Sequence, residues 1–185
     1  IYAPQISYNP HNSTYYMITT DVGSKEGHFY VTATDPEGSW SNPVWLKGID
    51  GIDPSLFFDD DGSAYIVYKE DTTGRPKWSN YRCIRFIAFD PESGQTVGDS
   101  WPLAEAGVGP EEHLDRDEGP HIYKIDGRYF LICAEGGTSN HHSAVIYRAD
   151  SLRGEFTRWS RNPALTQRYL KEKRTNPITC TGHAD

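Results

Sequence analysis

Residues 117–138 read DEGPHIYKIDGRYFLICAEGGT, and this stretch decides the fold. Apolar and polar residues alternate on both sides of an Asp126-Gly127 turn, which is typical of two antiparallel strands. Gly119 and Pro120 interrupt regular structure just before the first strand. We therefore expect the carboxyl group of Glu118 at the entrance of a strand. The alternative is a solvated loop glutamate without chemical function.

The same strand, turn and strand pattern occurs three times. Its copies span residues 5–18, 55–67 and 121–132. A third strand is expected after each copy, at 29–33, 83–89 and 144–148. Turns then lead towards an outer strand, at 35–38, 90–94 and 150–154. Helical periodicity is hard to find, so the sequence predicts an all-β chain.

Repeats of about 50 to 65 residues, each with four short antiparallel strands, are typical of β-propeller blades. Propellers close with about four to eight blades, so about three blades predict an incomplete ring. The length of 185 residues fits a single domain. We expect residues 1–185 to form one partial β-propeller domain.

The composition excludes several kinds of partner. The formal net charge is -8 and no basic cluster is longer than residues 169–174, so nucleic acid is not an expected partner. No apolar run is long enough to cross a bilayer, and residues 1–4 do not read as a signal peptide. Aromatic residues make up 13% of the chain, which suits half-buried strands or surfaces that stack on sugars.

Several residues resemble metal or modification sites but are better explained otherwise. Cys83, Cys133 and Cys180 are too few and too widely spaced for a disulfide scaffold or a zinc site, so we expect buried apolar residues. Residues 59–62 and 140–142 are expected to be turns rather than metal sites. The sequence at 12–14 fits a glycosylation acceptor, to which we assign no role.

The second and third repeats are each preceded by a residue with a carboxylate side chain. Asp53 stands before Pro54 ahead of the second repeat, and Glu118 before Gly119-Pro120 ahead of the third. The first strand of each propeller blade lines the central channel, so residues at one blade position converge on the axis. We therefore expect Asp53 and Glu118 to face each other across one pocket, where like-charge repulsion raises at least one pKa.

Five motifs in order resemble glycoside hydrolase family 43, whose catalytic domain is a five-bladed β-propeller. They are IDPSLFFDDDG (52–62), EGPHIYK (118–124), AEGGT (134–138), NPALT (162–166) and GHAD (182–185). The family includes β-xylosidases, α-L-arabinofuranosidases and arabinanases. The second and third motifs are most similar to the exo-acting β-xylosidase and arabinofuranosidase branches.

The resemblance implies an inverting hydrolase that uses three carboxylates. Glu118 matches the general acid, and Asp53 matches the residue that orients this acid and modulates its pKa. His183 matches a histidine near the ring axis that supports a hydrated Ca2+ or another cation in many members. No organic cofactor is implied.

The resemblance also suggests residues beside the sugar. Tyr2 and Ala3 stand where many relatives have Trp-Ala, and Thr138 borders the sugar pocket. The family's general-base aspartate has no match, because Asp21 and Asp35 follow Tyr2 and are expected in turns. The isolated chain is therefore expected to bind sugar but barely to turn it over.

We therefore expect an enzyme that removes xylose or arabinose units from plant polysaccharides or their oligosaccharides. Its partner is a pentose-containing saccharide, and export is inferred only from the extracellular location of such polymers. Three alternatives remain open: a non-catalytic carbohydrate-binding propeller, an endo-arabinanase, and an interaction scaffold in which Asp53 and Glu118 are solvated and far apart.

Overall fold

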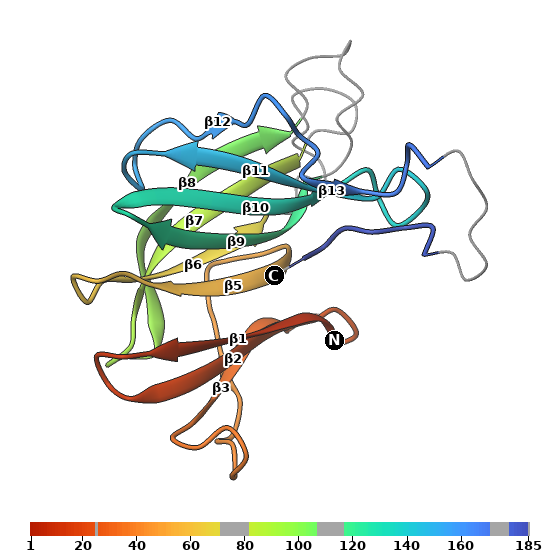
Figure 1. Cartoon of the computed structure of the whole chain (residues 1–185). Helices are drawn as coiled ribbons and strands as arrows, with labels where there is room; N and C mark the ends of the chain where they lie inside the picture. The colour runs from red at the N-terminus through yellow and green to blue at the C-terminus, as the bar shows by residue number, and fades with distance from the viewer. Residues whose placement is uncertain (25, 71–81, 107–116, 171–177, 185) are drawn as a thin grey trace.

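The computed structural model describes residues 1–24, 26–70, 82–106, 117–170 and 178–184. These residues form three antiparallel sheets that follow one another along the chain (Figure 1). The expected all-β fold is confirmed. No helix in the described part of the chain is long and apolar enough to cross a membrane.

Each repeat forms one four-stranded unit, as predicted. The first sheet contains β1 (Tyr2–Asn9), β2 (Thr14–Asp21), β3 (Gly27–Ala33) and β4 (Val44–Trp45). The second contains β5 (Ile52–Phe58), β6 (Ala64–Lys69), β7 (Arg82–Asp90) and β8 (Gln95–Ala106). The third contains β9 (Glu118–Ile125), β10 (Arg128–Glu135), β11 (Ser143–Ala149) and β12 (Thr157–Arg158), and β13 (Leu165–Thr166) also pairs with β11.

Two apolar cores hold the three sheets together. Ile18 and Ile66 belong to the core between the first and second sheets. Phe86 and Leu131 belong to the core between the second and third sheets. All four side chains are fully buried, and each such burial contributes about 1.5–3 kcal/mol. The predicted burial of the cysteines is confirmed for Cys83 and Cys133, whereas Cys180 is half-buried.

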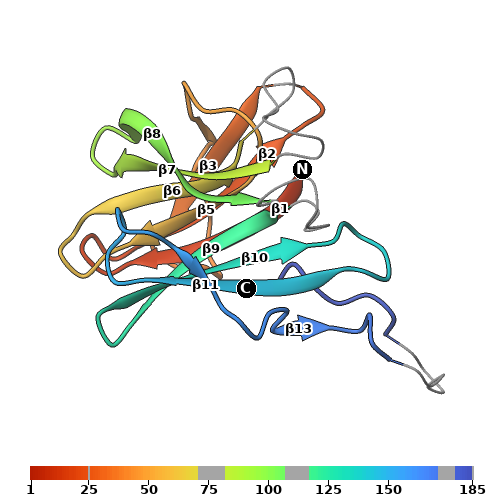
Figure 2. The ribbon, with the colours of Figure 1, turned by 90° about the horizontal axis from the view of Figure 1, so that it is seen from above.

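The first strands of the three sheets, β1, β5 and β9, lie side by side towards the middle of Figure 2. They belong to different sheets, and side chains link them instead of a backbone ladder. Ser7 Oγ donates to the Leu56 carbonyl at 2.9 Å, and Leu56 N–H donates to Gln5 Oε1 at 3.1 Å. Ser55 Oγ donates to the Pro120 carbonyl at 2.5 Å. These bonds fix the inner strands relative to one another.

Asp59 makes a further link between sheets. The turn expected at 59–62 is present, with Gly62 N–H donating to the Asp59 carbonyl at 3.1 Å. The Asp59 side chain is buried, and it accepts hydrogen bonds from Lys124 Nζ at 2.5 Å and Tyr129 Oη at 2.6 Å. This aspartate therefore ties the second sheet to the third, a role that the sequence did not predict.

Each inner strand begins with a β-bulge, in which two residues oppose one on the neighbouring strand. The bulged pairs are Ala3-Pro4, Asp53-Pro54 and Gly119-Pro120. Their first residues have positive φ values of 41°, 55° and 55°, which are uncommon for residues other than glycine. Proline is tolerated here because a bulge does not need its missing N–H. Bulges re-aim side chains and are frequent beside active sites.

One buried histidine makes the fold sensitive to acid. His28 is fully buried in β3, with Nδ1 2.8 Å from Thr20 Oγ1. Burial lowers the pKa of His28 to about 4, against the opposing effects of the Asp50 backbone and charge. An unfolded histidine titrates near pH 6.5, so the unfolded state binds more protons between pH 6.5 and 4. Stability is therefore lost as the pH falls through this window.

Substituting His28→Gln removes this titration. As the pH falls from 7 to 5, we expect the free energy of unfolding of the unsubstituted chain to drop by about 2 kcal/mol more than that of the variant. Urea unfolding of both proteins at the two pH values measures this difference. A difference that does not change with pH would contradict the assignment.

Candidate active site

The bulges of β5 and β9 bring Asp53 and Glu118 together at the inner edge of the sheets. Asp53 is the bulged residue of β5, whereas Glu118 directly precedes the bulge of β9. Relative to the bulge of its own strand, Glu118 corresponds to Ile52, and Gly119 corresponds to Asp53. We expected both carboxylates at the same blade position, but Glu118 lies one residue ahead of it. The bulged residue is the one before proline, which is Asp53 in β5 and Gly119 in β9.

The two carboxylates are nevertheless neighbours. Gly119 N–H donates to Asp53 Oδ2 at 3.1 Å, so Asp53 holds the residue that follows Glu118. Burial, which leaves Asp53 only 5% exposed, is the main cause that raises its pKa. The charge of His183 opposes this rise, and the charge of Glu118 adds to it. Burial therefore outweighs the like-charge repulsion that the sequence suggested.

Glu118 has a cationic partner that sequence reasoning missed. Lys69 Nζ lies 3.0 Å from Glu118 Oε2, and the two side chains are only 14% and 17% exposed. An ion pair that is largely withdrawn from solvent is stronger than one at the surface. Lys69 is the last residue of β6 and lies outside every motif. It reaches the site because the sheet register sets it opposite Ile52.

The C-terminal residues return to the same place. His183 lies near enough to Asp53 for its charge to lower the pKa of that carboxyl group. A Cβ atom added to Gly119 would lie 2.4 Å from Nε2 of His183, so the imidazole packs directly on this glycine. Any larger side chain at position 119 would displace the histidine ring. His183 itself has a φ of 50°, as the bulged residues do.

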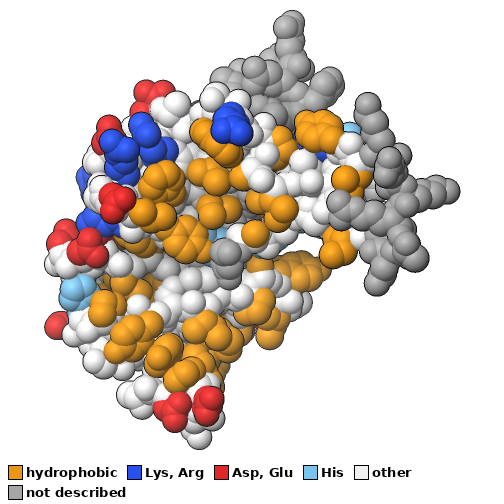
Figure 3. All heavy atoms as spheres, viewed as in Figure 1, with side chains coloured by type: hydrophobic (Ala, Val, Ile, Leu, Met, Phe, Trp, Pro, Cys, Tyr) orange, Lys and Arg blue, Asp and Glu red, His pale blue; other side chains and the backbone are white. Residues whose placement is uncertain are grey.

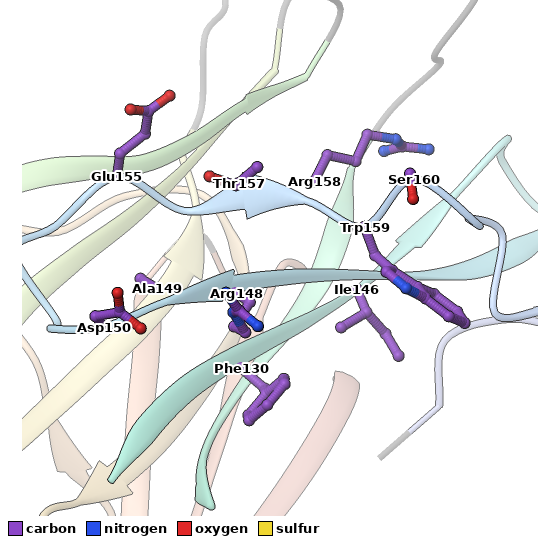
Figure 4. Close-up of a pocket in the computed structure, with 10 residues that line it drawn as sticks. All are labelled: Phe130, Ile146, Arg148, Ala149, Asp150, Glu155, Thr157, Arg158, Trp159 and Ser160. Atoms are coloured by element: carbon purple, nitrogen blue, oxygen red, sulfur yellow. The ribbon is translucent and has the colours of Figure 1, made fainter.

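Three hollows in the described part of the chain are large enough to hold a small ligand. One of about 570 Å3 is lined by residues such as Asp50, Tyr68 and Arg85, and by neither carboxylate. The smaller of the other two, about 470 Å3, follows the inner strands and includes Ser55 and His121, which lie just beyond the bulges. The larger, about 650 Å3, lies against the third sheet and is lined by residues such as Phe130, Ile146 and Trp159 (Figure 4). The larger hollow lies on the face of the third sheet that points away from the second sheet. Neighbouring residues of a strand point to opposite faces, and Leu131, which follows Phe130 in β10, faces the core.

The larger hollow is the poorer candidate. Figure 3 shows apolar side chains gathered over the third sheet, with many charged side chains at its rim. Extended apolar surfaces of this kind are typical of contacts with other protein. Neither Asp53 nor Glu118 lines this hollow or the smaller one. We assign the candidate active site to the inner edge, because Ser55 and His121 of the smaller hollow follow the two carboxylates along β5 and β9.

A family model described as glycosyl hydrolases family 43 matches residues 1–185. The chain belongs to this family. A xylosidase/arabinosidase of Butyrivibrio fibrisolvens is 42% identical over 187 residues, which cover 100% of this chain and 35% of that protein. A non-reducing end alpha-L-arabinofuranosidase of Bacteroides ovatus is 36% identical over 186 residues, with coverage of 100% and 31%.

The family 43 fold is equally clear in solved structures. A crystal structure of a GH43_12 protein from a capybara gut metagenome matches with a TM-score of 0.85 at 44% identity, covering 93% of this chain and 32% of that one. The chain thus spans about a third of the length of these relatives. The predicted β-propeller, present here as three blades, is confirmed.

The other residues matched to family 43 patterns lie in different places. Tyr2 is exposed and directly precedes the bulge of β1, as Glu118 precedes that of β9, and Ala3 is the bulged residue of β1. Thr138 is exposed in the loop that follows β10. Asp21 and Asp35 cap turns, accepting from the backbone N–H groups of residues 23 and 37 at 2.8 and 3.0 Å. Neither aspartate is therefore placed to act as a base.

The cation site that the family resemblance implies near His183 stays a prediction. No three His, Cys, Asp or Glu side chains in the described part of the chain gather closely enough to hold a metal ion. A cation beside His183 would therefore take water for most of its ligands, as the hydrated cation of the resemblance does. We propose no catalytic role for a cation here.

A buried polar network adjoins the site. Asp117 is 1% exposed, and its Oδ2 accepts a hydrogen bond from Tyr147 Oη at 2.6 Å. Tyr147 in turn accepts from Arg158 Nη1 at 3.0 Å, and Arg158 Nη2 lies 2.5 Å from Glu135 Oε2. The second carboxylate oxygen of Asp117 has no partner among the described residues. Burial raises the pKa of Asp117 to about 6, against the hydrogen bond from Tyr147.

Substituting Asp117→Asn tests this buried charge. The folded state binds more protons than the unfolded state between pH 4 and 6, so stability falls as the pH rises through this window. As the pH rises from 4 to 7, we expect the free energy of unfolding of the unsubstituted chain to drop by about 2 kcal/mol more than that of the variant. Urea unfolding across this range gives the difference. Parallel curves for the two proteins would show that Asp117 does not titrate in this window.

Proposed function

We propose that the protein containing this chain is an inverting glycoside hydrolase that removes xylose or arabinose units from plant polysaccharides or oligosaccharides. Glu118 protonates the leaving glycosidic oxygen, and Asp53 orients Glu118. The observation that carries this proposal is the Gly119 to Asp53 hydrogen bond, which sets the entrance of the Glu118 strand against a second, buried carboxylate. Relatives named xylosidase/arabinosidase and alpha-L-arabinofuranosidase support the substrate class.

The orienting role of Asp53 follows from its position. Its side chain is almost fully buried and bonds to the backbone beside the acid, so it is poorly placed to activate a water molecule. In an inverting reaction the base must lie about 6.5 to 9.5 Å from the acid, with room for water between them. Since Asp21 and Asp35 hold turns, we infer that the base lies outside residues 1–185.

We also propose how the sugar is held. Tyr2 is exposed and precedes the bulge of β1 as Glu118 precedes that of β9, so its ring is available to stack on a terminal sugar. Ala3 leaves room beside this ring, and Thr138 borders the sugar from the third sheet. An aromatic ring in this place favours removal of terminal units over internal cleavage.

One observation favours a second candidate, a propeller that binds pentoses without cleaving them. Glu118 forms an ion pair with Lys69, and a carboxylate held in this way accepts hydrogen bonds from sugar hydroxyls. Calorimetry of the full-length protein with xylose and arabinose, beside a hydrolysis assay, separates the two candidates. Binding without any product would favour the second.

The variant Glu118→Gln in the full-length protein tests the acid role. We expect kcat/KM on alkyl pentosides, which are poor leaving groups, to fall by about 100-fold or more. The loss on nitrophenyl pentosides should be much smaller, because these leaving groups need little protonation. Glu155→Gln, at an exposed carboxylate of the third sheet, serves as the control and should leave both rates unchanged. Equal losses on both substrate types would argue against Glu118 as the acid.

A further inference from the structure

We propose that Lys69 is a positioning residue that holds Glu118 in place and stabilises the carboxylate formed when Glu118 gives up its proton. This inference rests on the proposed role of Glu118 as the acid. The observation that carries it is the 3.0 Å separation of Lys69 Nζ and Glu118 Oε2, between side chains that are only 14% and 17% exposed.

The fold delivers the ammonium group to this point. Lys69 ends β6 opposite Ile52, the residue that precedes the bulged Asp53 on β5. Its side chain therefore extends from the second sheet to the entrance of the third, beside both carboxylates. Burial dominates the raised pKa of Asp53, and the charge of Lys69 opposes that rise only weakly. Lys69 thus acts chiefly on Glu118.

Four charged or titratable groups surround Glu118. Asp53 approaches from β5, Lys69 from β6, Asp117 from the preceding position of the same segment, and His183 from the C-terminal segment that packs on Gly119. Two of the four are acids, which make a negative charge on Glu118 less favourable. Lys69 is the one described side chain that forms an ion pair with Glu118 and offsets this repulsion.

The pair has a defined place in the proposed reaction. The proton passes from the Glu118 carboxyl group to the glycosidic oxygen as the bond between that oxygen and the sugar carbon breaks. Water adds to the sugar carbon and gives its proton to the base. Glu118 is left as a carboxylate beside the Lys69 ammonium, which keeps its own proton throughout. Lys69 therefore stabilises the charge that Glu118 carries once its proton has left.

A purely structural salt bridge is the competing explanation. Lys124 offers the matched comparison, because it also crosses from the third sheet to the second and lies 2.5 Å from Asp59 Oδ1. Both lysines join the same two sheets through a largely buried carboxylate. Only Lys69 contacts the proposed acid.

The test compares Lys69→Met, Lys69→Arg and Lys124→Met in the full-length protein. For each, kcat/KM on an alkyl pentoside is measured from pH 4 to pH 9, together with the melting temperature. The same is measured on a nitrophenyl pentoside. Lys69→Met should lower the rate on the alkyl pentoside about 10-fold more than the rate on the nitrophenyl pentoside, whose leaving group needs little protonation. Lys69→Arg should keep the original ratio of the two rates, and Lys124→Met should change only the melting temperature. If Lys69→Met does not fold, Lys69→Gln replaces it.

The outcomes separate this inference from the proposed function. A ratio of the two rates that stays unchanged in Lys69→Met, while Glu118→Gln shows its loss on poor leaving groups, would overturn the role of Lys69 alone. A Glu118→Gln variant with equal losses on both substrate types would instead overturn the acid assignment. A ratio that changes equally in Lys69→Met and Lys124→Met would reduce Lys69 to a structural salt bridge.

Discussion

The hydrogen bond from Gly119 N–H to Asp53 joins two β-bulges on strands of different sheets, and the candidate site depends on it. The bond requires a positive φ at both residues and an aspartate that is nearly removed from solvent. Glycine is needed at 119 because the His183 ring occupies the space of a Cβ atom. Since the groups stand at strand entrances and not on long loops, the surrounding sheets fix their positions.

Most of the fold could be predicted from the sequence, because its signals are local. Alternation around the turns at 59–62 and 126–127 defines hairpins without knowledge of distant residues. The offset between Asp53 and Glu118 could not be predicted in the same way. Both precede a proline motif, and only the pairing of each strand with its neighbour shows which residue forms the bulge.

The contacts that sequence reasoning missed join positions far apart in the chain. Lys69 and Glu118 are separated by 49 residues, and Asp59 and Lys124 by 65. A charged residue at the end of a strand is usually solvated, so nothing near Lys69 distinguishes it from a surface lysine. Its partner is determined by how the second and third sheets pack, which the two apolar cores control.

The charge balance of the site also follows from these constraints. Among the described residues, Asp53, Glu118, Asp117 and Glu135 act on one another in a chain, whereas the cations beside them are Lys69, paired with Glu118, and Arg158, paired with Glu135. The site therefore carries more acid than base. Such an arrangement is unfavourable for an anionic ligand. It suits glycoside cleavage, in which positive charge develops on the sugar ring in an oxocarbenium-like transition state. The buried carboxylates reduce stability at neutral pH, and the same desolvation strengthens their interaction with a cationic centre.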